Sequence, residues 1–399
     1  MTGVNSFSVS GYGPDRAGWT RLFARDSLTR RLDWPILLAA LVLSLLGSLL
    51  VYSATRNRTE INQGDQYYFL VRHLMNLGIG FALMIGTIWL GHRALRNVVP
   101  ILYGVSLLGV LLVLTPLGAT INGSRNWIVF GGGFSLQPAE FVKVSIILGM
   151  AMILAARVDA GDKPYPDHRT VVQALGLATV PILIVLLMPD LGTVLAMVAI
   201  ILGVLLASGA SNRWIFGLLI AGVLGCVAIW QLHILDQYQI NRFAAFANPE
   251  LDPAGVGYNT NQARIAIGSG GLTGAGLFHG SQTTGQFVPE QQTDFVFTVA
   301  GEELGFVGAG LIIFLLGVVL WRACRIARES TELYGTIVAA GIVAWFAFQS
   351  FENIGMTLGI MPVTGLPLPF VSYGGSSMFV VWVAVGLLQS IKVQRPMSA

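Results

Sequence analysis

Long apolar runs alternate with short polar segments along most of the chain. Each run holds about 20 residues, which is the length that an α-helix needs to cross roughly 30 Å of hydrocarbon. The pattern therefore predicts an all-α fold, a polytopic membrane protein with about ten transmembrane helices. The predicted helices lie near residues 33–54, 72–91, 98–116, 139–157, 171–188, 191–208, 214–234, 296–321, 336–356 and 376–391.

Positive charges gather in every second segment between these runs. They are Arg21, Arg25, Arg30, Arg31, Arg93, Arg96, Arg157, Lys163, Arg169, Arg213, Arg322, Arg325, Arg328, Lys392 and Arg395. The positive-inside rule places these segments, and with them both termini, in the cytoplasm. The chain then divides into a cytoplasmic tail at 1–32, a transmembrane domain at 33–391 and a second cytoplasmic tail at 392–399. A large extracytoplasmic loop at 235–293 is expected between the seventh and eighth helices.

The composition supports a membrane protein and excludes several other classes. Hydrophobic residues make up 54% of the chain and charged residues only 11%, and the mean hydropathy is +0.70, whereas soluble domains carry about 25% charged residues. The net charge of +3 is too small to indicate nucleic-acid binding. Cys226 and Cys324 fall in different apolar runs without neighbouring ligand residues, which argues against a disulfide framework or a thiolate metal site. No cleavable signal peptide is predicted, because the first thirty residues are polar and rich in arginine.

The stretch 287–303 places polar and charged residues directly against the start of an apolar helix. Asp294 precedes Phe295, so its carboxylate is expected where a membrane helix meets the outer aqueous phase. Thr293 or Asp294 can cap that helix, because a side-chain oxygen there accepts from free backbone N–H groups and the helix dipole favours negative charge. A carboxylate in this place can equally be catalytic, and these residues alone leave both interpretations open.

Ionisable residues inside the predicted helices are few, and a charge at mid-bilayer costs from about 2.5 kcal/mol upward. Glu140 and Lys143 stand three residues apart on one face of the fourth helix, where they can form a structural pair or leave Lys143 for a substrate. Asp190 begins the sixth helix and can cap it or pair with a cation such as Lys143 or Arg125. Interior polar pairing is also expected for Glu302, Glu303, Glu352 and Asn353.

The outer loop at 235–293 is too long and too rich in aromatic and apolar residues for an idle linker. We expect short amphipathic helices there, lying at the membrane interface. The glycine cluster at 268–271 is typical of a turn, and a phosphate cradle is the weaker alternative.

Several longer motifs, in order along the chain, carry a family resemblance. They are Gln137-Pro138-Ala139-Glu140-Phe141-Val142-Lys143, Pro189-Asp190-Leu191-Gly192-Thr193, NPELDPAGVGY at 248–258, AIGSGG at 266–271, PEQQTDFVF at 289–297, GEELGFVG at 301–308 and PVTGLPLPFVSYGGSS at 362–377. Together they resemble the SEDS family, the shape, elongation, division and sporulation proteins, from about Trp34 to the last helix. The AIGSGG segment and the Gly280-Ser281-Gln282 step are closer to the elongation branch, RodA, than to the division branch, FtsW.

Three positions depart from the family pattern. Gln292 stands where the family usually has histidine, Ala139 replaces a usual serine, and Ala275 replaces a common lysine or glutamine. The acidic residue Asp294 is retained, so its central role is unaffected. The departure at Gln292 argues against a mechanism that needs a histidine beside the aspartate.

The resemblance implies a peptidoglycan glycosyltransferase that polymerises lipid II, the undecaprenyl-pyrophosphate-linked disaccharide pentapeptide. The reaction would take place on the outer face of the bacterial cytoplasmic membrane and serve cell elongation. Asp294 is then the expected general base for the attacking GlcNAc 4-hydroxyl group. Cations stabilise the leaving pyrophosphate, and the candidates are, in order, Arg125, Lys143, Arg264 and Arg242. The further residues expected at the substrate are Glu140, Asp190, Gln137 and Glu290.

A divalent cation on the pyrophosphate, Mg²⁺ or Mn²⁺, stays open, although no dense acidic cluster indicates a metal site. The implied partner is a class B penicillin-binding protein, a single-span transpeptidase whose helix would pack beside the bundle. Two other functions compete with the transferase. A lipid II flippase also suits ten helices with buried charges, whereas a pure scaffold would not need such costly charges.

Overall fold

The computed structural model describes residues 31–58, 64–121, 124–130, 134–188, 190–231 and 255–394, with the single positions 240 and 246. Most of the predicted N-terminal tail, the end of the C-terminal tail, Arg242 and the first part of the long outer loop lie outside the described residues. The order of elements below refers to the described part of the chain.

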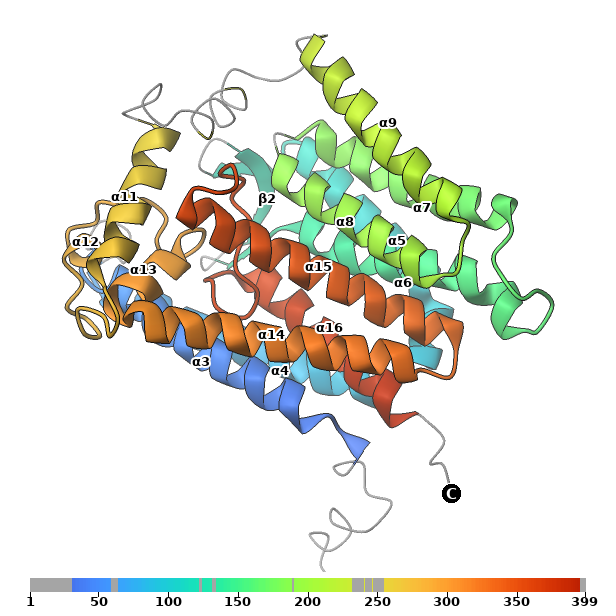
Figure 1. Cartoon of the computed structure of the whole chain (residues 1–399), viewed down its shortest axis with the longest axis horizontal. Coiled ribbons are helices and arrows are strands. Elements are labelled where there is room, and N and C mark those ends of the chain that lie inside the picture. Colours follow the sequence, from blue (N-terminus) through green and yellow to red (C-terminus); the bar gives the residue numbers. More distant parts are fainter. Residues whose placement is uncertain are drawn as a thin grey trace, which may run out of the picture.

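Helices dominate the structure, as the apolar runs predict (Figure 1). They are α3 Trp34–Thr55, α4 Tyr68–Leu90, α5 His92–Leu114, α6 Pro138–Asp159, α7 His168–Leu186, α8 Leu191–Ala207, α9 Asn212–Gln231, α11 Val256–Ser269, α12 Ser281–Thr284, α13 Val296–Glu303, α14 Gly305–Glu329, α15 Leu333–Leu358 and α16 Gly375–Val393. Among the described residues, eight helices are long and apolar enough to cross a membrane, and α8 and α9 contribute shorter apolar stretches. Every predicted apolar run coincides with one of these helices or, at 296–321, with two.

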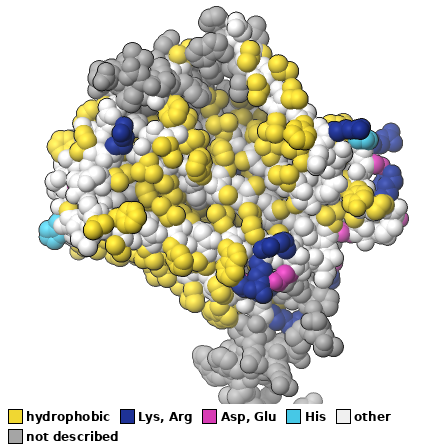
Figure 2. All heavy atoms as spheres, in the orientation of Figure 1, with side chains coloured by type: hydrophobic (Ala, Val, Ile, Leu, Met, Phe, Trp, Pro, Cys, Tyr) yellow, Lys and Arg dark blue, Asp and Glu magenta, His cyan; other side chains and the backbone are white. Residues whose placement is uncertain are grey.

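The helices divide into an interior set and an outer set. Most residues of α6, α15 and α16 are buried, whereas fewer than a third of those in α5 and α7 are. On α5 the side chains of Ile101, Val105 and Leu108 are each more than half exposed, and their spacing places them on one face of the helix. Hydrophobic side chains cover much of the face shown in Figure 2. Such a surface is stable against hydrocarbon and unfavourable in water.

Asp33 joins three helix ends at one end of the bundle. Its side chain caps α3 and accepts hydrogen bonds from Arg322 Nε at 2.9 Å and Lys392 Nζ at 3.0 Å. Burial raises the pKa of Asp33, but the hydrogen bonds from Arg322 and Lys392 outweigh burial and hold that pKa below its usual value. The start of α3 and the ends of α14 and α16 therefore lie together, which agrees with the predicted placement of both termini on one side.

A small antiparallel sheet corrects the all-α expectation for the loop before α6. Its strands are β1 Gly118–Ile121, β2 Ser124–Phe130 and β3 Phe134–Leu136, in the order β1-β2-β3. Ile128 of β2 pairs with Gly118 on one side and Leu136 on the other. The aromatic and β-branched run at 127–130 favours a strand, but the many glycines of this segment indicated an irregular loop.

The single helix predicted at 296–321 is broken into α13 and α14. Gly305 has a φ of +64°, and a Cβ atom there would lie 2.2 Å from the main-chain nitrogen of Gly274. Only glycine fits this conformation and this close approach. The turn predicted at 268–271 lies at 270–273, because α11 continues to Ser269. It packs against the break, since Phe306 N donates to Gly271 O at 2.9 Å. Helices α11 and α12 are the short helices expected in the outer loop.

Candidate active site

The segment between α15 and α16, residues 359–374, is the element on which the candidate residues converge. Its main-chain oxygens accept from two buried amides of α15, with Gln349 Nε2 bound to Pro367 O and Asn353 Nδ2 bound to Leu366 O, both at 2.7 Å. A buried irregular segment needs such partners, because an unpaired main-chain carbonyl is costly away from water. We refer to residues 359–374 as the central loop.

Asp294 lies beside this central loop and is half-buried. A Cβ atom at Gly365 would lie 3.3 Å from Asp294 Oδ2, so the carboxylate faces that glycine. The main-chain oxygen of Asp294 accepts from Asn353 Nδ2 at 2.8 Å. The capping prediction is wrong: α13 begins at Val296 with Phe295 in the N-cap position and no side-chain cap hydrogen bond. The carboxylate of Asp294 is therefore not used to start the helix.

The residues just before Asp294 form a polar group around Glu290. Glu290 Oε2 accepts from Gln292 Nε2 and Thr293 Oγ1, each at 3.2 Å. Arg58 donates to Val288 O at 2.9 Å and to Gln292 Oε1 at 3.4 Å. Burial lowers the pKa of Arg58, and the negative charge of Glu290 opposes that effect. The Gln292 amide thus accepts from the guanidinium of Arg58 and donates to the carboxylate of Glu290.

Sequence reasoning missed Arg58, although a signal was present. Arg58 follows the first apolar run, on the side of the membrane where the positive-inside rule expects few cations. A cation on that side is expected to have a specific partner. The partners of Arg58 are Val288 and Gln292, in the segment just before Asp294.

Glu140 and Lys143 form a fully buried ion pair. Lys143 Nζ lies 2.7 Å from Glu140 Oε1 and donates to Gln349 Oε1 at 3.0 Å. The Trp345 ring covers the ammonium at 4.9 Å, and Trp345 Nε1 also donates to Gln349 Oε1, at 2.6 Å. Because Gln349 in turn holds Pro367 O, the pair is connected to the central loop. This geometry matches the structural interpretation of the pair.

Asp190 caps α8, which is one of the two alternatives that the sequence left open. Asp190 Oδ1 accepts from Thr193 N at 3.0 Å, and Oδ2 accepts from Thr193 Oγ1 at 2.9 Å. Its other partners are amides, Asn126 Nδ2 at 3.2 Å and Gln137 Nε2 at 3.3 Å. Asp190 thus ties β2 and the start of α6 to the start of α8.

The candidate cations of the outer side are exposed. Arg125 donates to the main-chain oxygens of Thr115 and Gly118, at the end of α5. Arg264 on α11 lies beside Gly359 of the central loop. Arg242 lies outside the described residues.

Six of the candidate residues fall into three pairs, Asp294 with Glu290, Lys143 with Glu140 and Asp190 with Gln137. The central loop or its continuation into α16 is connected to each pair. Tyr373 N donates at 2.8 Å to Gln292 O, between Glu290 and Asp294. Pro367 O accepts from Gln349, which binds Lys143. Ser376 Oγ accepts from Gln137 N at 2.8 Å in the Asp190 pair.

Metal ligands are not clustered in the part of the chain that the structure describes. There, no group of three or more histidine, cysteine, aspartate or glutamate side chains could hold a metal ion. A divalent cation carried on the pyrophosphate stays a prediction.

A family model and the related proteins that match this chain all indicate the same family. The model of the cell cycle protein family of FtsW, RodA and SpoVE matches residues 33–396. Stage V sporulation protein E of Bacillus subtilis is 37% identical over 361 residues, covering 90% of this chain and 96% of that protein. A probable peptidoglycan glycosyltransferase FtsW of Trichlorobacter lovleyi is 36% identical, covering 90% and 92%. The peptidoglycan glycosyltransferase MrdB of Escherichia coli K12 is 34% identical, covering 92% and 95%.

Solved structures share the fold. A chain from a structure of a peptidoglycan synthase complex that coordinates polymerization and crosslinking superposes with a TM-score of 0.74 at 29% identity, covering 92% of this chain and 99% of that one. Rod shape determining protein RodA of Thermus thermophilus gives a TM-score of 0.65 at 28% identity, covering 92% and 98%. The identities to the sporulation, division and MrdB proteins are too similar to assign a branch. Because the family model and these relatives each span about nine-tenths of the sequence, the chain belongs to the FtsW/RodA/SpoVE family of cell cycle proteins, the SEDS family.

Proposed function

We propose that this protein is a peptidoglycan glycosyltransferase that polymerises lipid II into glycan strands. The observation that carries the proposal is the state of Asp294: a half-buried carboxylate beside the central loop, with its main chain fixed by Asn353 and no part in capping α13. The names of FtsW and MrdB relatives, which are peptidoglycan glycosyltransferases, support the same reaction.

The reaction is a single inverting displacement. The 4-hydroxyl oxygen of an acceptor GlcNAc attacks C1 of the donor MurNAc, and the bond from C1 to the pyrophosphate oxygen breaks. Asp294 takes the hydroxyl proton as the new C–O bond forms, and undecaprenyl pyrophosphate leaves with the bonding electrons. An α-linked lipid sugar becomes a β-linked glycan in one inversion, so no second, nucleophilic carboxylate is needed. General base catalysis of this kind contributes about 10²- to 10⁴-fold.

The leaving pyrophosphate needs positive charge near it. We propose Arg125, Arg264 and Arg242 for this role; Arg125 and Arg264 are exposed, and the proposed topology assigns all three to the outer face. Lys143 is completely buried between Glu140 and Gln349. Its proposed contribution is to hold Gln349 and, through it, the central loop. Glu290, Gln137 and Asp190 are proposed to shape the site around the sugar units.

The proposed location is the bacterial cytoplasmic membrane, with the active site on the outer face. The apolar helices and the cations at one end of the bundle support this orientation. The proposed partner is a class B penicillin-binding protein, which the similarity to a chain of a peptidoglycan synthase complex supports. The role in cell elongation stays a prediction.

The test is the Asp294→Asn variant, purified with its transpeptidase partner and given lipid II in detergent. Asparagine keeps the size of the side chain but cannot take the proton, so glycan formation should fall by about 10²-fold or more. Asp65→Asn is the matched control, because Asp65 is an exposed carboxylate in the loop between α3 and α4, and it should polymerise like wild type. Detergent contains no leaflets, so polymer formed there is not transport. A wild-type complex that makes no polymer, or an Asp294→Asn variant that polymerises normally, would favour the flippase instead.

A further inference from the structure

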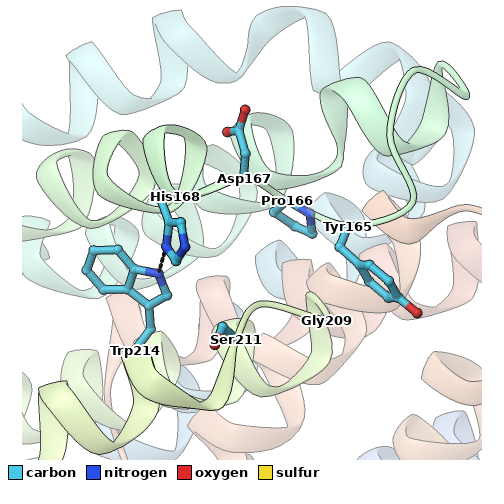
Figure 3. Close-up of a pocket in the computed structure, with 7 residues that line it drawn as sticks. All are labelled: Tyr165, Pro166, Asp167, His168, Gly209, Ser211 and Trp214. Carbon is cyan, nitrogen blue, oxygen red and sulfur yellow. Dashed lines mark hydrogen bonds between the residues drawn. The ribbon is translucent and has the colours of Figure 1, made fainter.

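A pocket of about 320 Å³ lies between the α6–α7 connection and the α8–α9 connection (Figure 3). Tyr165, His168, Ser211 and Trp214 are among the residues that line it. The positive-inside pattern assigns both connections to the cytoplasmic side. The pocket is therefore remote from Asp294 in the chain and belongs to the opposite end of the predicted topology.

The walls of the pocket are aromatic and carry hydrogen-bond donors. Trp214 Nε1 donates to His168 Nδ1 at 3.0 Å, which leaves the proton of the neutral His168 ring on Nε2. On the other side, the Tyr165 ring approaches Gly209, with Cδ1 at 3.2 Å from the position of a Cβ atom there. Figure 3 shows the Ser211 side chain between these two walls. The pocket thus offers the His168 N–H and the Ser211 hydroxyl to a ligand.

The charge around the pocket is positive. The one carboxylate that lines it, Asp167, points away from the space between the aromatic walls in Figure 3. Asp167 Oδ2 is held by Lys163 Nζ at 2.7 Å and Arg157 Nη1 at 3.3 Å. The hydrogen bond from Lys163 holds the pKa of Asp167 well below its usual range, so this acid stays ionised and neutralised.

Two arginines stand next in sequence to the lining residues His168 and Trp214. Arg169 is the second residue of α7 and Arg213 is the second residue of α9, and both are exposed. Neither forms an ion pair with any residue that the structure describes. From residue 157 on, the four cations Arg157, Lys163, Arg169 and Arg213 outnumber the three carboxylates of the same connections, Asp159, Asp162 and Asp167. Figure 2 shows lysine, arginine and histidine side chains at this end, with acidic side chains among them, beside an apolar face.

Exposed apolar side chains follow two helices away from the pocket, and we refer to them as the apolar tracks. Helices α7 and α9 both begin at the pocket and are joined there by the His168–Trp214 hydrogen bond. Val172 and Leu183 on α7, and Phe216 and Ile220 on α9, are each more than half exposed. One polar, positive pocket above two apolar tracks has the shape of an amphiphile with an anionic head and two hydrocarbon chains.

We propose that this pocket binds the phosphate headgroup of an anionic glycerophospholipid of the inner leaflet, with its acyl chains along α7 and α9. Basic pockets between helices on the cytoplasmic side are suited to such headgroups, and aromatic side chains with a polar edge are favoured at that depth. The site is independent of glycan transfer, and its ligand is a structural or regulatory lipid rather than the substrate.

The test is lipid binding to the purified, delipidated full-length protein, measured by native mass spectrometry with phosphatidylglycerol and phosphatidylcholine. Wild type should bind phosphatidylglycerol more tightly than phosphatidylcholine. The Arg169→Gln/Arg213→Gln variant should lose about ten- to thirtyfold in affinity for phosphatidylglycerol alone, since each basic residue near the surface contributes about a fivefold effect. Its melting temperature in detergent should not change, because both side chains are exposed and unpaired.

The matched control is Arg325→Gln/Arg328→Gln near the end of α14, where both arginines are exposed and on the same predicted side. It removes the same charge and should bind phosphatidylglycerol like wild type. Equal losses in the two double variants would show that a diffuse surface potential attracts the lipid, and they would overturn the proposed binding site at the pocket. Equal affinity of wild type for both lipids would overturn it as well. Displacement of phosphatidylglycerol by excess inorganic phosphate would show a free-phosphate site and overturn the assignment to a lipid.

Discussion

Asn353 donates a hydrogen bond of 2.8 Å from its side-chain amide to the main-chain oxygen of Asp294. The same nitrogen donates to the main-chain oxygen of Leu366 at 2.7 Å. Asn353 is fully buried and Leu366 is also buried, whereas Asp294 is half-buried. One side chain of α15 thus joins the segment that carries Asp294 to the central loop, and it holds the Asp294 carboxylate beside Gly365.

Replacing Asn353 by leucine should lower both stability and turnover. Leucine keeps a similar size but removes the donor of both carbonyls, and leaving a buried carbonyl such as that of Leu366 unpaired costs about 1–3 kcal/mol. The Asp294 carboxylate then loses its fixed position, and a misplacement of this kind can reduce turnover by about 10²-fold. Polymerisation of lipid II per folded molecule, together with a melting curve, measures the two effects.

Gln389→Leu is the control for Asn353→Leu. Gln389 is also fully buried, and its amide donates to the main-chain oxygen of Asp33 at 2.9 Å, at the other end of the bundle. This variant should lose stability while its folded fraction keeps wild-type turnover. Equal turnover in the two variants would mean that Asn353 contributes only to folding.

Gly365→Ala should reduce turnover through the Asp294 carboxylate. The φ of Gly365 is +77°, and a Cβ atom would lie 3.3 Å from Asp294 Oδ2. Alanine in this conformation costs about 1–2 kcal/mol, and the carboxylate must also shift by a few tenths of an ångström. Gly161→Ala separates the two effects, because Gly161 has a φ of +79° and no atom within 4 Å of its Cβ position. Assays of both variants at equal folded concentration should show the loss of turnover for Gly365→Ala only.

The sequence was sufficient for the parts of this fold that depend on local pattern. Apolar runs of about 20 residues locate the helices, because each must span the hydrocarbon alone. Capping was one of the two roles expected for Asp190, because it directly precedes an apolar run. The same reasoning failed at Asp294, where the residue is followed by Phe295 in the N-cap position and the acid faces another loop.

Contacts between distant segments could not be read from local pattern. Helical spacing placed Asn353 in the interior but gave no sign that its partner is Asp294, 59 residues away. Gln349 was not singled out at all, because a lone amide in an apolar helix has no local signature. Both amides donate to main-chain carbonyls, which carry no side-chain signal.

Cysteine labelling should place the 281–294 segment outside and the α14–α15 connection inside. The arginines Arg322, Arg325 and Arg328 support this orientation. After replacement of Cys226 and Cys324, an impermeant thiol reagent should modify Ser281→Cys in intact spheroplasts, while Ser330→Cys should react only after lysis. Labelling of Ser330→Cys alone in intact cells would reverse the topology.

The buried pair of Glu140 and Lys143 allows stability and activity to be separated. Lys143→Met leaves the Glu140 carboxylate uncompensated at 1% exposure, and breaking a buried pair costs about 3–5 kcal/mol. Adding Glu140→Gln removes the unpaired charge, so the double variant should recover most of the melting temperature. Thermal unfolding in detergent measures this recovery.

Turnover should not recover together with the melting temperature. The double variant still lacks Lys143 Nζ, which donates to Gln349 Oε1 at 3.0 Å in the wild type. Gln349 then holds Pro367 O less firmly, and the central loop beside Asp294 loosens. We expect the stable double variant to stay about 10- to 100-fold below wild type in lipid II polymerisation. Gln349→Met should show a similar loss if Lys143 acts through that amide, and a much smaller one if Lys143 reaches the pyrophosphate itself. Recovery of turnover together with stability would reduce Lys143 to a counterion of Glu140.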